Sequence, residues 1–527
     1  MPLPRLRPAV LAALLIFFGA ILIATTWRRF SDTVDESTHV GAGLELLQYH
    51  RYTLQPENPP LPRVVFGATA LAGGMRISDP EDRMIALHSV FYDHGEYRKN
   101  LIAARCGNLL FYALAAILLY LLARRELSER GAVIAVLLFV TQPIILGYSG
   151  IANHDLAGTA GFALSLLAFS SWLRMPDAKH AAILGLAFSF SVLCKFSNLG
   201  FVPAACAAIF AVRLLHDPEL RRGVVRKLAL VIAIVPAVTA IVIWAGYAFT
   251  VARAFDLHYF QSYLPLISRL PPLAPIPAPE FFRGIAGLIE ISRGAFQSYL
   301  FGEVRDFGWW YYFPVAVALK TTLSFLALLI AGFFVARKNR AFAESLAAAG
   351  AVLAVSMTSH LDLGVRYVLP AYIPMTIAAA AATVALLEHK RVALRYAAIV
   401  AISLQMISLG LAAPDYFPYF NALAGDDPGR YLVDSNLDWG QDVLRLRSEV
   451  RRLRIDRIGL YVGWYDAHAL GFPKSYNLTL AKPADGWLAI SEHAYRTDGN
   501  GRAWSWLDWY AMRRIGKSIR LYYVPPC

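Results

Sequence analysis

The chain has 527 residues, of which 57% are hydrophobic and only 17% are charged. Soluble domains carry about a quarter charged residues, so this composition excludes an ordinary soluble protein and indicates a chain that lies mostly in lipid. The formal net charge is +13, but the placement of the basic residues argues for a membrane topology and against a nucleic-acid partner.

Eleven hydrophobic runs have about the length that crosses roughly 30 Å of hydrocarbon as a helix. They cover residues 9–27, 101–123, 131–148, 157–173, 181–194, 197–212, 228–250, 311–336, 341–358, 368–387 and 396–413. The first run resembles an uncleaved anchor, because no small-residue cleavage site follows it. A single helix over 181–212 would invert every later loop, so we favour two short spans there.

Basic residues gather in the short connectors at alternate ends of these runs, which is the pattern of cytoplasmic loops. The clusters are Arg5 and Arg7; Arg124, Arg125 and Arg130; Arg174 and Lys179; Arg213, Arg221, Arg222, Arg226 and Lys227; Arg337, Lys338 and Arg340; and Lys390, Arg391 and Arg395. This pattern predicts a multi-pass protein with a cytoplasmic N-terminus. It places the long polar segments 28–100, 251–310 and 414–527 outside.

The first two outer segments lie within a predicted membrane domain of residues 1–413. Stretches 38–50 and 81–92 have amphipathic periodicity, which predicts helices along the membrane interface. Prolines crowd residues 271–279, which predicts extended backbone.

Residues 414–527 are expected to form a small α/β domain outside the membrane. The pattern predicts a helix from an N-cap at Asp438 to about Arg454 and a second helix near 503–514. Strands are predicted at 458–463, 487–491 and 518–524. Turn and cap roles account for Asp434, Asn436 and Asp438, and we expect the domain to stabilise or cover the outer loops.

Carboxylates stand at two points of the outer face: Asp35 and Glu36 after the first run, and Asp155 after His154 in a short loop. They fit a solvated loop or, for Asp155, the cap of a helix that begins at Leu156. They also fit a site that holds a general base or a metal, since desolvation near lipid raises the pKa of a carboxyl group toward neutrality.

Four cations lie at membrane depth on the same face: Arg105, Lys195, Lys320 and Arg366. Each taken singly is explained by snorkelling to the headgroups. Beside two acidic sites, together they indicate a pocket that holds a phosphate while a carboxylate acts on a hydroxyl.

Several motifs together resemble a known family. They are Asp35-Glu36, Pro59-Pro60-Leu61, Asn153-His154-Asp155, Lys195, the aromatic run 308–314 leading to Lys320-Thr321, the segment 366–370 and the tail motif 431–442. The chain resembles, over essentially its whole length, the bacterial relatives of protein O-mannosyltransferases. These are members of glycosyltransferase family 39 with the GT-C fold, which also includes the lipid A aminoarabinose transferases.

The resemblance implies an α-helical polytopic membrane protein of GT-C type, with about eleven transmembrane helices and a small C-terminal α/β domain on the outer face. It implies a glycosyltransferase of the bacterial inner membrane. The enzyme would transfer a sugar from a polyprenyl-phosphate donor, with inversion, to a hydroxyl of a protein, lipid or glycan. The sugar and the acceptor stay open.

The resemblance also implies roles for particular residues. Asp35 matches the catalytic base, Glu36 its partner, and Asp155 the second acid, which organises the site or a metal. Arg366 matches the residue that contacts the donor phosphate, with Lys195, Lys320 and Arg105 as helpers. Relatives often have a histidine where this chain has Asn58, so no role for that histidine transfers.

A divalent metal is compatible with the sequence but not required by it. Its ligands would come from Asp35, Glu36, His154 and Asp155, without a decisive spacing. Other classes remain open: a transporter, because charges at membrane depth also line permeation paths; a transferase that uses a diphosphate-linked oligosaccharide; and a non-catalytic scaffold on the same fold.

Overall fold

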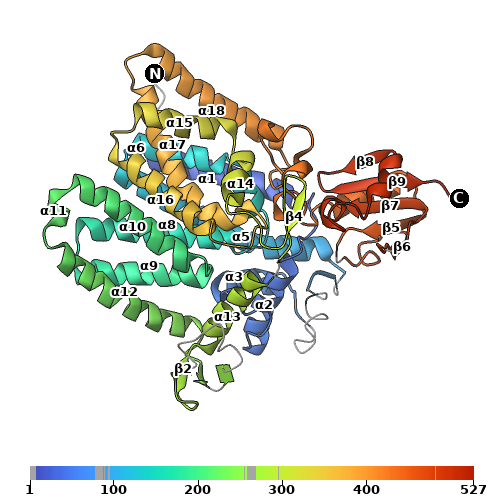
Figure 1. The fold of residues 1–527 in the computed structure, drawn as a ribbon, viewed down its shortest axis with the longest axis horizontal. Helices are drawn as coiled ribbons and strands as arrows, with labels where there is room; N and C mark the ends of the chain where they lie inside the picture. Colours follow the sequence, from blue (N-terminus) through green and yellow to red (C-terminus); the bar gives the residue numbers. More distant parts are fainter. Residues whose placement is uncertain are drawn as a thin grey trace.

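The computed structural model describes residues 7–526 apart from 78–86, 88–89, 93–94, 255, 258–268, 295, 464 and 481. A helical bundle forms most of the molecule, and a small sheet lies beside one end of it (Figure 1). The bundle helices are α1 (Pro8–Thr26), α5 (Tyr97–Glu126), α6 (Glu129–Val140), α7 (Pro143–Ser149), α8 (Asp155–Arg174), α9 (Ala178–Cys194), α10 (Asn198–His216), α11 (Pro218–Arg221), α12 (Val224–Gly246), α14 (Tyr312–Lys320), α15 (Leu323–Val335), α16 (Arg340–Ser356), α17 (Tyr372–Leu387) and α18 (Val392–Ala412).

The described residues contain seven helices long and apolar enough to span a membrane, or up to nine when two bent pairs count as one span each. The pairs are α6 with α7, bent by 65°, and α14 with α15, bent by 112°. Proline at the start of α7 lacks the N–H that would continue the ladder, which accounts for the first bend. All eleven predicted runs coincide with helices, but two of these, α9 and α16, have only 17 residues each and are not counted among the seven to nine.

Burial separates the centre of the bundle from its lipid-facing rim. Of the 18 consecutive residues that are most apolar in the helical stretch Val365–Leu387, 89% are buried. The corresponding shares for α1, α12 and α18 are 22%, 11% and 17%. Consecutive alanines let neighbouring helices approach α17 closely, as small residues do in membrane interiors. The predicted polytopic helical fold is confirmed.

Two helices fill much of the segment between α1 and α5: α2 (Glu36–Tyr49) and α3 (Pro60–Ala72). Their backbones touch, because a Cβ atom added to Gly43 would lie 1.9 Å from the carbonyl oxygen of Arg63. The helix predicted at 38–50 is confirmed as α2, and its place along the membrane interface stays a prediction. Most of the stretch predicted at 81–92 lies outside the described residues.

The second long segment contains strands and one helix. Strand β1 (Val251–Arg253) pairs antiparallel with β2 (Pro275–Pro277), so the proline-rich stretch is extended there, as predicted. Helix α13 (Pro279–Arg293) follows, and then a hairpin of β3 (Ser298–Leu300) and β4 (Glu303–Arg305).

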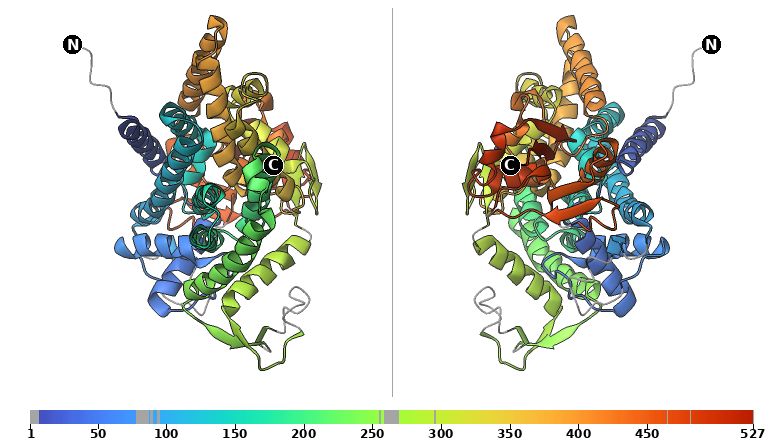
Figure 2. Two further views of the ribbon diagram at one scale, coloured as in Figure 1. Left: turned by 90° about the vertical axis from the view of Figure 1, so that its left-hand side faces the viewer. Right: turned by 90° about the vertical axis from the view of Figure 1, so that its right-hand side faces the viewer.

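The C-terminal sheet has five strands in the order β6-β5-β7-β9-β8. Strand β5 (Arg457–Tyr461) is parallel to β6 (Lys474–Asn477) and β7 (Gly486–Ser491), whereas β9 (Ile519–Val524) is antiparallel to β7 and β8 (Met512–Ile515). The three predicted strands are confirmed as β5, β7 and β9. Figure 2 shows the sheet against the end of the bundle.

The helices of this domain differ from the prediction. The first, α19 (Val443–Arg452), begins after Asp442 and not after Asp438, because the Asp438 carboxylate accepts hydrogen bonds from the Gly440 and His493 N–H groups and stabilises a turn. The helix predicted near 503–514 is wrong: a 3-10 turn (Ser505–Trp509) and strand β8 lie there. A short helix, α20 (Glu492–Thr497), was not predicted.

Candidate active site

Five elements meet at the end of the bundle that carries the C-terminal sheet. Asp35 precedes α2, Asp155 begins α8, Lys195 follows α9, Arg366 lies in the 3-10 segment before α17, and Trp439 precedes α19. Each residue lies at an end of a helix or in a connection, where side chains from different helices can converge. We refer to this group, together with Tyr367, as the Arg366 cluster.

Arg366 lies between two carboxylates. Its Nη1 atom is 3.4 Å from Asp35 Oδ2 and 3.8 Å from Asp155 Oδ2. The Lys195 ammonium donates to the other oxygen of Asp155. The Asp155 side chain is fully buried, whereas that of Asp35 is 33% exposed. Asp35 is therefore the acid of the cluster that an incoming molecule can reach.

Asp155 does not cap its helix. The helix already begins at Asp155, and the Asn153 side-chain oxygen accepts the Asp155 N–H. The alternative that Asp155 serves only as a cap is therefore wrong. Its carboxylate instead orients two cations, Lys195 and Arg366.

Aromatic rings cover the same cations. The Arg366 guanidinium carbon is 4.7 Å from the Tyr367 ring centroid and 4.4 Å from that of Trp439. The Lys195 ammonium lies 5.1 Å from the Tyr367 ring. Cations are attracted to the faces of aromatic rings at these distances, so the rings restrain the cations and still leave their charge available to a ligand.

The surroundings of Asp35 favour a base. Burial raises the pKa of its carboxyl group above the ordinary value of 3.8, while the positive charge of Arg366 opposes the rise. The negative charges of Asp434 and Asp155 raise the pKa further. A carboxylate of raised pKa holds a proton more readily than an ordinary aspartate does.

Two histidines, His39 and His154, contact one another next to the elements that carry Asp35 and Asp155. Arg63 Nε donates to His39 Nδ1 at 3.3 Å, and His39 Nε2 lies 3.2 Å from His154 Nδ1. Because arginine has no acceptor atom, His39 must carry its proton on Nε2 and donate it to His154. Burial lowers the pKa of both rings, so both are neutral. In the sequence His39 follows Asp35-Glu36 by about one helical turn, and we assigned it no role there; its contact with His154 comes from the fold.

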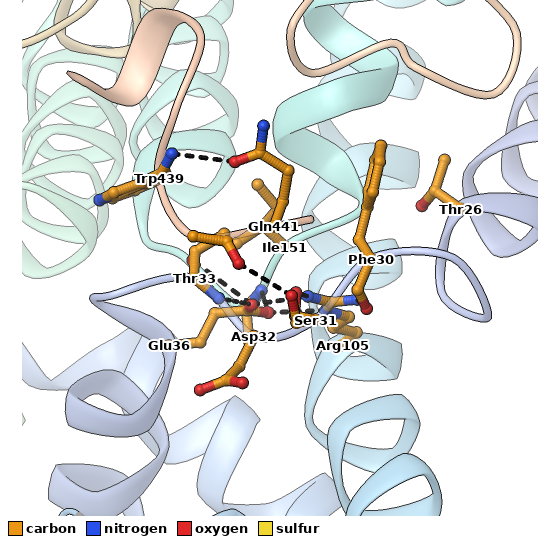
Figure 3. Close-up of polar contacts among 12 residues, drawn as sticks. Thr26, Phe30, Ser31, Asp32, Thr33, Glu36, Arg105, Ile151, Trp439 and Gln441 are labelled. Atoms are coloured by element: carbon orange, nitrogen blue, oxygen red, sulfur yellow. Dashed lines mark hydrogen bonds and ion pairs between the residues drawn. The ribbon is translucent and has the colours of Figure 1, made fainter. Parts of the chain in front are cut away.

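Glu36, the first residue of α2, and Arg105 on α5 bind one another (Figure 3). Arg105 Nε is 2.8 Å from Glu36 Oε1, and Nη2 is 2.7 Å from Oε2, with both side chains fully buried. Glu36 also accepts the N–H groups of Ala152 and Thr33. The pair joins the loop before α2 to the connection before α8, and in this arrangement neither residue is open to a substrate.

Lys320 is likewise engaged within the protein. Its ammonium donates to the carbonyl oxygens of Phe417, at 3.0 Å, and of Asn436. The side chain is fully buried. Lys320 thus supports the segment that leads to Trp439, and it is not among the cations that surround Asp35.

The four side chains considered as metal ligands do not converge. Glu36 is taken by Arg105, Asp155 by Lys195, and His154 by His39. Among the described residues, no group of three or more His, Cys, Asp or Glu side chains is placed to hold a metal ion. The residues as arranged do not fit a resident metal.

The loop that carries Asp35 is bonded to the chain before α19. The Ser31 N–H donates to the Gln441 carbonyl at 2.9 Å, and the Val34 N–H donates to that of Trp439 at 3.2 Å. The Ser31 hydroxyl donates to the Gly440 carbonyl. No local pattern predicts this pairing, since the two segments are 409 residues apart at the Ser31–Gly440 contact.

Comparison with known proteins agrees with this architecture. Residues 97–245 match the family model described as dolichyl-phosphate-mannose-protein mannosyltransferase. Sequence comparison with curated proteins gives no match. Among solved structures, ArnT from Cupriavidus metallidurans in the apo state is similar with a TM-score of 0.52 and 12% identity, over 97% of each chain.

Two further structures are similar. ArnT from the same organism bound to undecaprenyl phosphate has a TM-score of 0.49 and 13% identity, over 97% of each chain. The apo oligosaccharyltransferase of Archaeoglobus fulgidus has a TM-score of 0.48 and 13% identity, over 97% of this chain and 73% of that one. The resemblance predicted from the motifs is confirmed: the chain is a multi-pass membrane protein with the GT-C fold of the ArnT and protein O-mannosyltransferase-like glycosyltransferases.

Proposed function

We propose that this chain transfers a sugar from a polyprenyl-phosphate donor to a hydroxyl acceptor on the extracytoplasmic face of the membrane. One observation carries the proposal: the partly exposed carboxylate of Asp35 lies beside Arg366, a cation that Asp155 and two aromatic rings orient. A base for a hydroxyl and a cationic site for a phosphate are thus adjacent. The similar ArnT structure is described as bound to undecaprenyl phosphate, which supports a carrier of this kind.

The reaction is a single displacement. Asp35 takes the proton of the acceptor hydroxyl as its oxygen forms a bond to the anomeric carbon. The bond from that carbon to the phosphate oxygen breaks, and its electron pair leaves with the polyprenyl phosphate. Arg366 and Lys195 stabilise the charge on the departing phosphate. Attack opposite to the leaving group inverts the anomeric centre.

One carboxylate suffices for this chemistry. A phosphate leaves as a stable anion and needs little protonation, whereas glycoside hydrolases use a second carboxyl group to protonate a poor leaving group. We therefore assign Asp155 the role of orienting Lys195 and Arg366, in keeping with its full burial.

The proposal includes a topology. The N-terminus is cytoplasmic, residues 1–413 form the membrane domain, and residues 414–527 form an outer domain. Leu432 and Trp439 of the latter pack in the same hydrophobic core as the bundle helices, which supports a role in covering the donor site.

Transfer assays in membranes test the proposal. Purified chain is supplied with labelled polyprenyl-phosphate sugars and membrane extract as the acceptor source, and the labelled product is identified. Asp35→Asn is expected to lose transfer by about a hundredfold or more, as removal of a general base does. The exposed Asp306→Asn serves as the matched control. Release of no sugar from any such donor by the wild-type chain would overturn the proposal.

A further inference from the structure

A groove outside the Arg366 cluster runs from the lipid-facing rim toward the C-terminal domain. Its first part, of about 730 Å³, lies between the ends of α1 and α18 and is lined by Ile21, Ala24, Thr25, Arg28, Arg29, Ala413 and Pro414. Its second part, of about 400 Å³, lies against α19 and is lined by Arg28, Arg29, Arg98, Leu444, Arg445, Ser448, Glu449 and Arg452. Arg28 and Arg29 line both parts, so the two lie next to one another. We refer to them together as the arginine groove.

The charges of this groove are unbalanced. Arg445 is paired with Asp415 at 2.5 Å and with Asp442 at 3.0 Å. Arg452 is paired with Glu449 at 2.7 Å. Within the described part of the chain, the remaining three arginines, Arg28, Arg29 and Arg98, form no ion pair, and all three are exposed. The groove thus presents three uncompensated positive charges.

The other wall of the first part is mostly apolar, with Ile21, Ala24, Ala413 and Pro414. Ile21 on α1 is 48% exposed, on the rim of the bundle that we place against lipid. Membrane proteins concentrate arginine and lysine in cytoplasmic loops. The topology proposed above places Arg28, Arg29 and Arg98 on the extracytoplasmic side. The preference of basic residues for cytoplasmic loops therefore does not explain them.

We propose that the arginine groove binds the headgroup of an anionic phospholipid of the leaflet next to the C-terminal domain. The phosphate would lie among Arg28, Arg29 and Arg98, because guanidinium groups donate paired hydrogen bonds to phosphate oxygens. An acyl chain would follow Ile21 and Ala24 into the bilayer. None of Asp35, Asp155, Lys195 or Arg366 lines the groove, so the site is separate from that proposed for the donor.

Spin-label measurements in bilayers test this site. The full chain is reconstituted in phosphatidylcholine with a trace of spin-labelled phosphatidylglycerol or, in parallel, spin-labelled phosphatidylcholine. For each probe, the fraction of spin label that is motionally restricted by the protein is measured. The fraction for phosphatidylglycerol divided by that for phosphatidylcholine gives the selectivity. Selectivity for phosphatidylglycerol is expected in the wild-type chain, and each arginine removed should lower affinity by about fivefold. Arg28→Ala with Arg29→Ala should therefore lose most of the selectivity.

A matched control removes two exposed cations of the C-terminal domain that do not line the groove, Lys482→Ala with Arg502→Ala. Thermal unfolding establishes that each variant is folded; if the Arg28 and Arg29 pair of substitutions prevents folding, Arg98→Ala takes its place. Equal selectivity in wild-type and groove variants would overturn the proposal. So would complete displacement of the lipid by inorganic phosphate at matched ionic strength, since the groove would then bind phosphate without regard to a lipid.

Discussion

The indole ring of Trp439 lies over the guanidinium group of Arg366, with 4.4 Å between the guanidinium carbon and the ring centroid. Trp439 comes from the segment that also bonds to the loop before Asp35, through its carbonyl and the Val34 N–H. One short segment therefore contacts both the proposed base loop and the proposed phosphate-binding cation. The C-terminal domain supplies part of the wall of the site.

Replacement of Trp439 should weaken donor binding. Cation–π contacts contribute about 0.5 to 2 kcal/mol, which corresponds to about twofold to thirtyfold in affinity. Trp439→Ala is expected to raise the KM for a polyprenyl-phosphate sugar within this range, and Trp439→Phe to raise it less. Trp509→Ala, at a tryptophan that is 89% exposed, is the control. Equal KM values for the Ala and Phe variants would show that the face of the ring does not contribute.

The pH dependence of transfer should report the surroundings of Asp35. Burial raises the pKa of this carboxyl group above 3.8, and a base works only when deprotonated. The rate should therefore fall as the pH drops through a value above that of an ordinary aspartate. Arg366 lowers the pKa of Asp35, so in the residual activity of Arg366→Gln the acidic limb of kcat/KM should move to higher pH. An unmoved limb would assign it to another group.

Glu36 and Arg105 should matter for folding. Each side chain is fully buried and bonded to the other, so Glu36→Gln leaves a buried guanidinium without its counter-charge. Breaking one side of a buried ion pair costs about 3 to 5 kcal/mol. A clear drop in the thermal unfolding temperature is expected, with partial recovery in Glu36→Leu combined with Arg105→Met.

Asp35→Asn provides the comparison for that experiment. Its carboxylate is partly exposed, so the variant should unfold close to the wild-type temperature while losing transfer. Normal stability with lost transfer in Glu36→Gln would instead give Glu36 the catalytic part that the family resemblance implies.

Hydrophobic run length predicted the membrane architecture well, because crossing lipid demands a long apolar helix. The same physics identified ionisable residues at membrane depth as requiring partners. It did not say which partner each one has. Lys195 and Arg366 meet Asp155, but Arg105 is bound by Glu36 and Lys320 by two backbone carbonyl groups.

The unpredicted part of the site depends on long-range contacts. Trp439 follows a stretch of cap and turn residues, and local pattern alone explained that stretch. Its position over Arg366 is a consequence of tertiary packing. The same limit applied to α19, since Asp438 and Asp442 are both suitable N-caps by residue type. The hydrogen bonds from the Gly440 and His493 N–H groups to Asp438 hold that residue in a turn before the helix.

Stability of the C-terminal domain should decline in acid through Glu492. Its carboxylate is fully buried and accepts from Arg520 at 2.6 and 2.8 Å, with Arg514 and Arg496 also in contact. Burial opposes ionisation, but hydrogen bonds and charge from Arg520 and its neighbours outweigh it and lower the pKa from 4.5 to about 2. Because this pKa is lower in the folded state, the ionised carboxylate stabilises that state. The stabilisation is complete at pH values above 4.5, the pKa expected in the unfolded chain. That stabilisation, about 3 kcal/mol, is lost as the pH falls from 4.5 to about 2.

Calorimetry of the full chain between about pH 6 and pH 2 measures this dependence. The wild-type transition of the C-terminal domain should shift to lower temperature across that window. Glu492→Gln should be less stable near neutral pH and should show a flatter dependence, because it has no carboxylate to protonate. Glu303→Gln, at a largely exposed carboxylate, should follow the wild type. Parallel curves for Glu492→Gln and the wild type would place the acid sensitivity at another group.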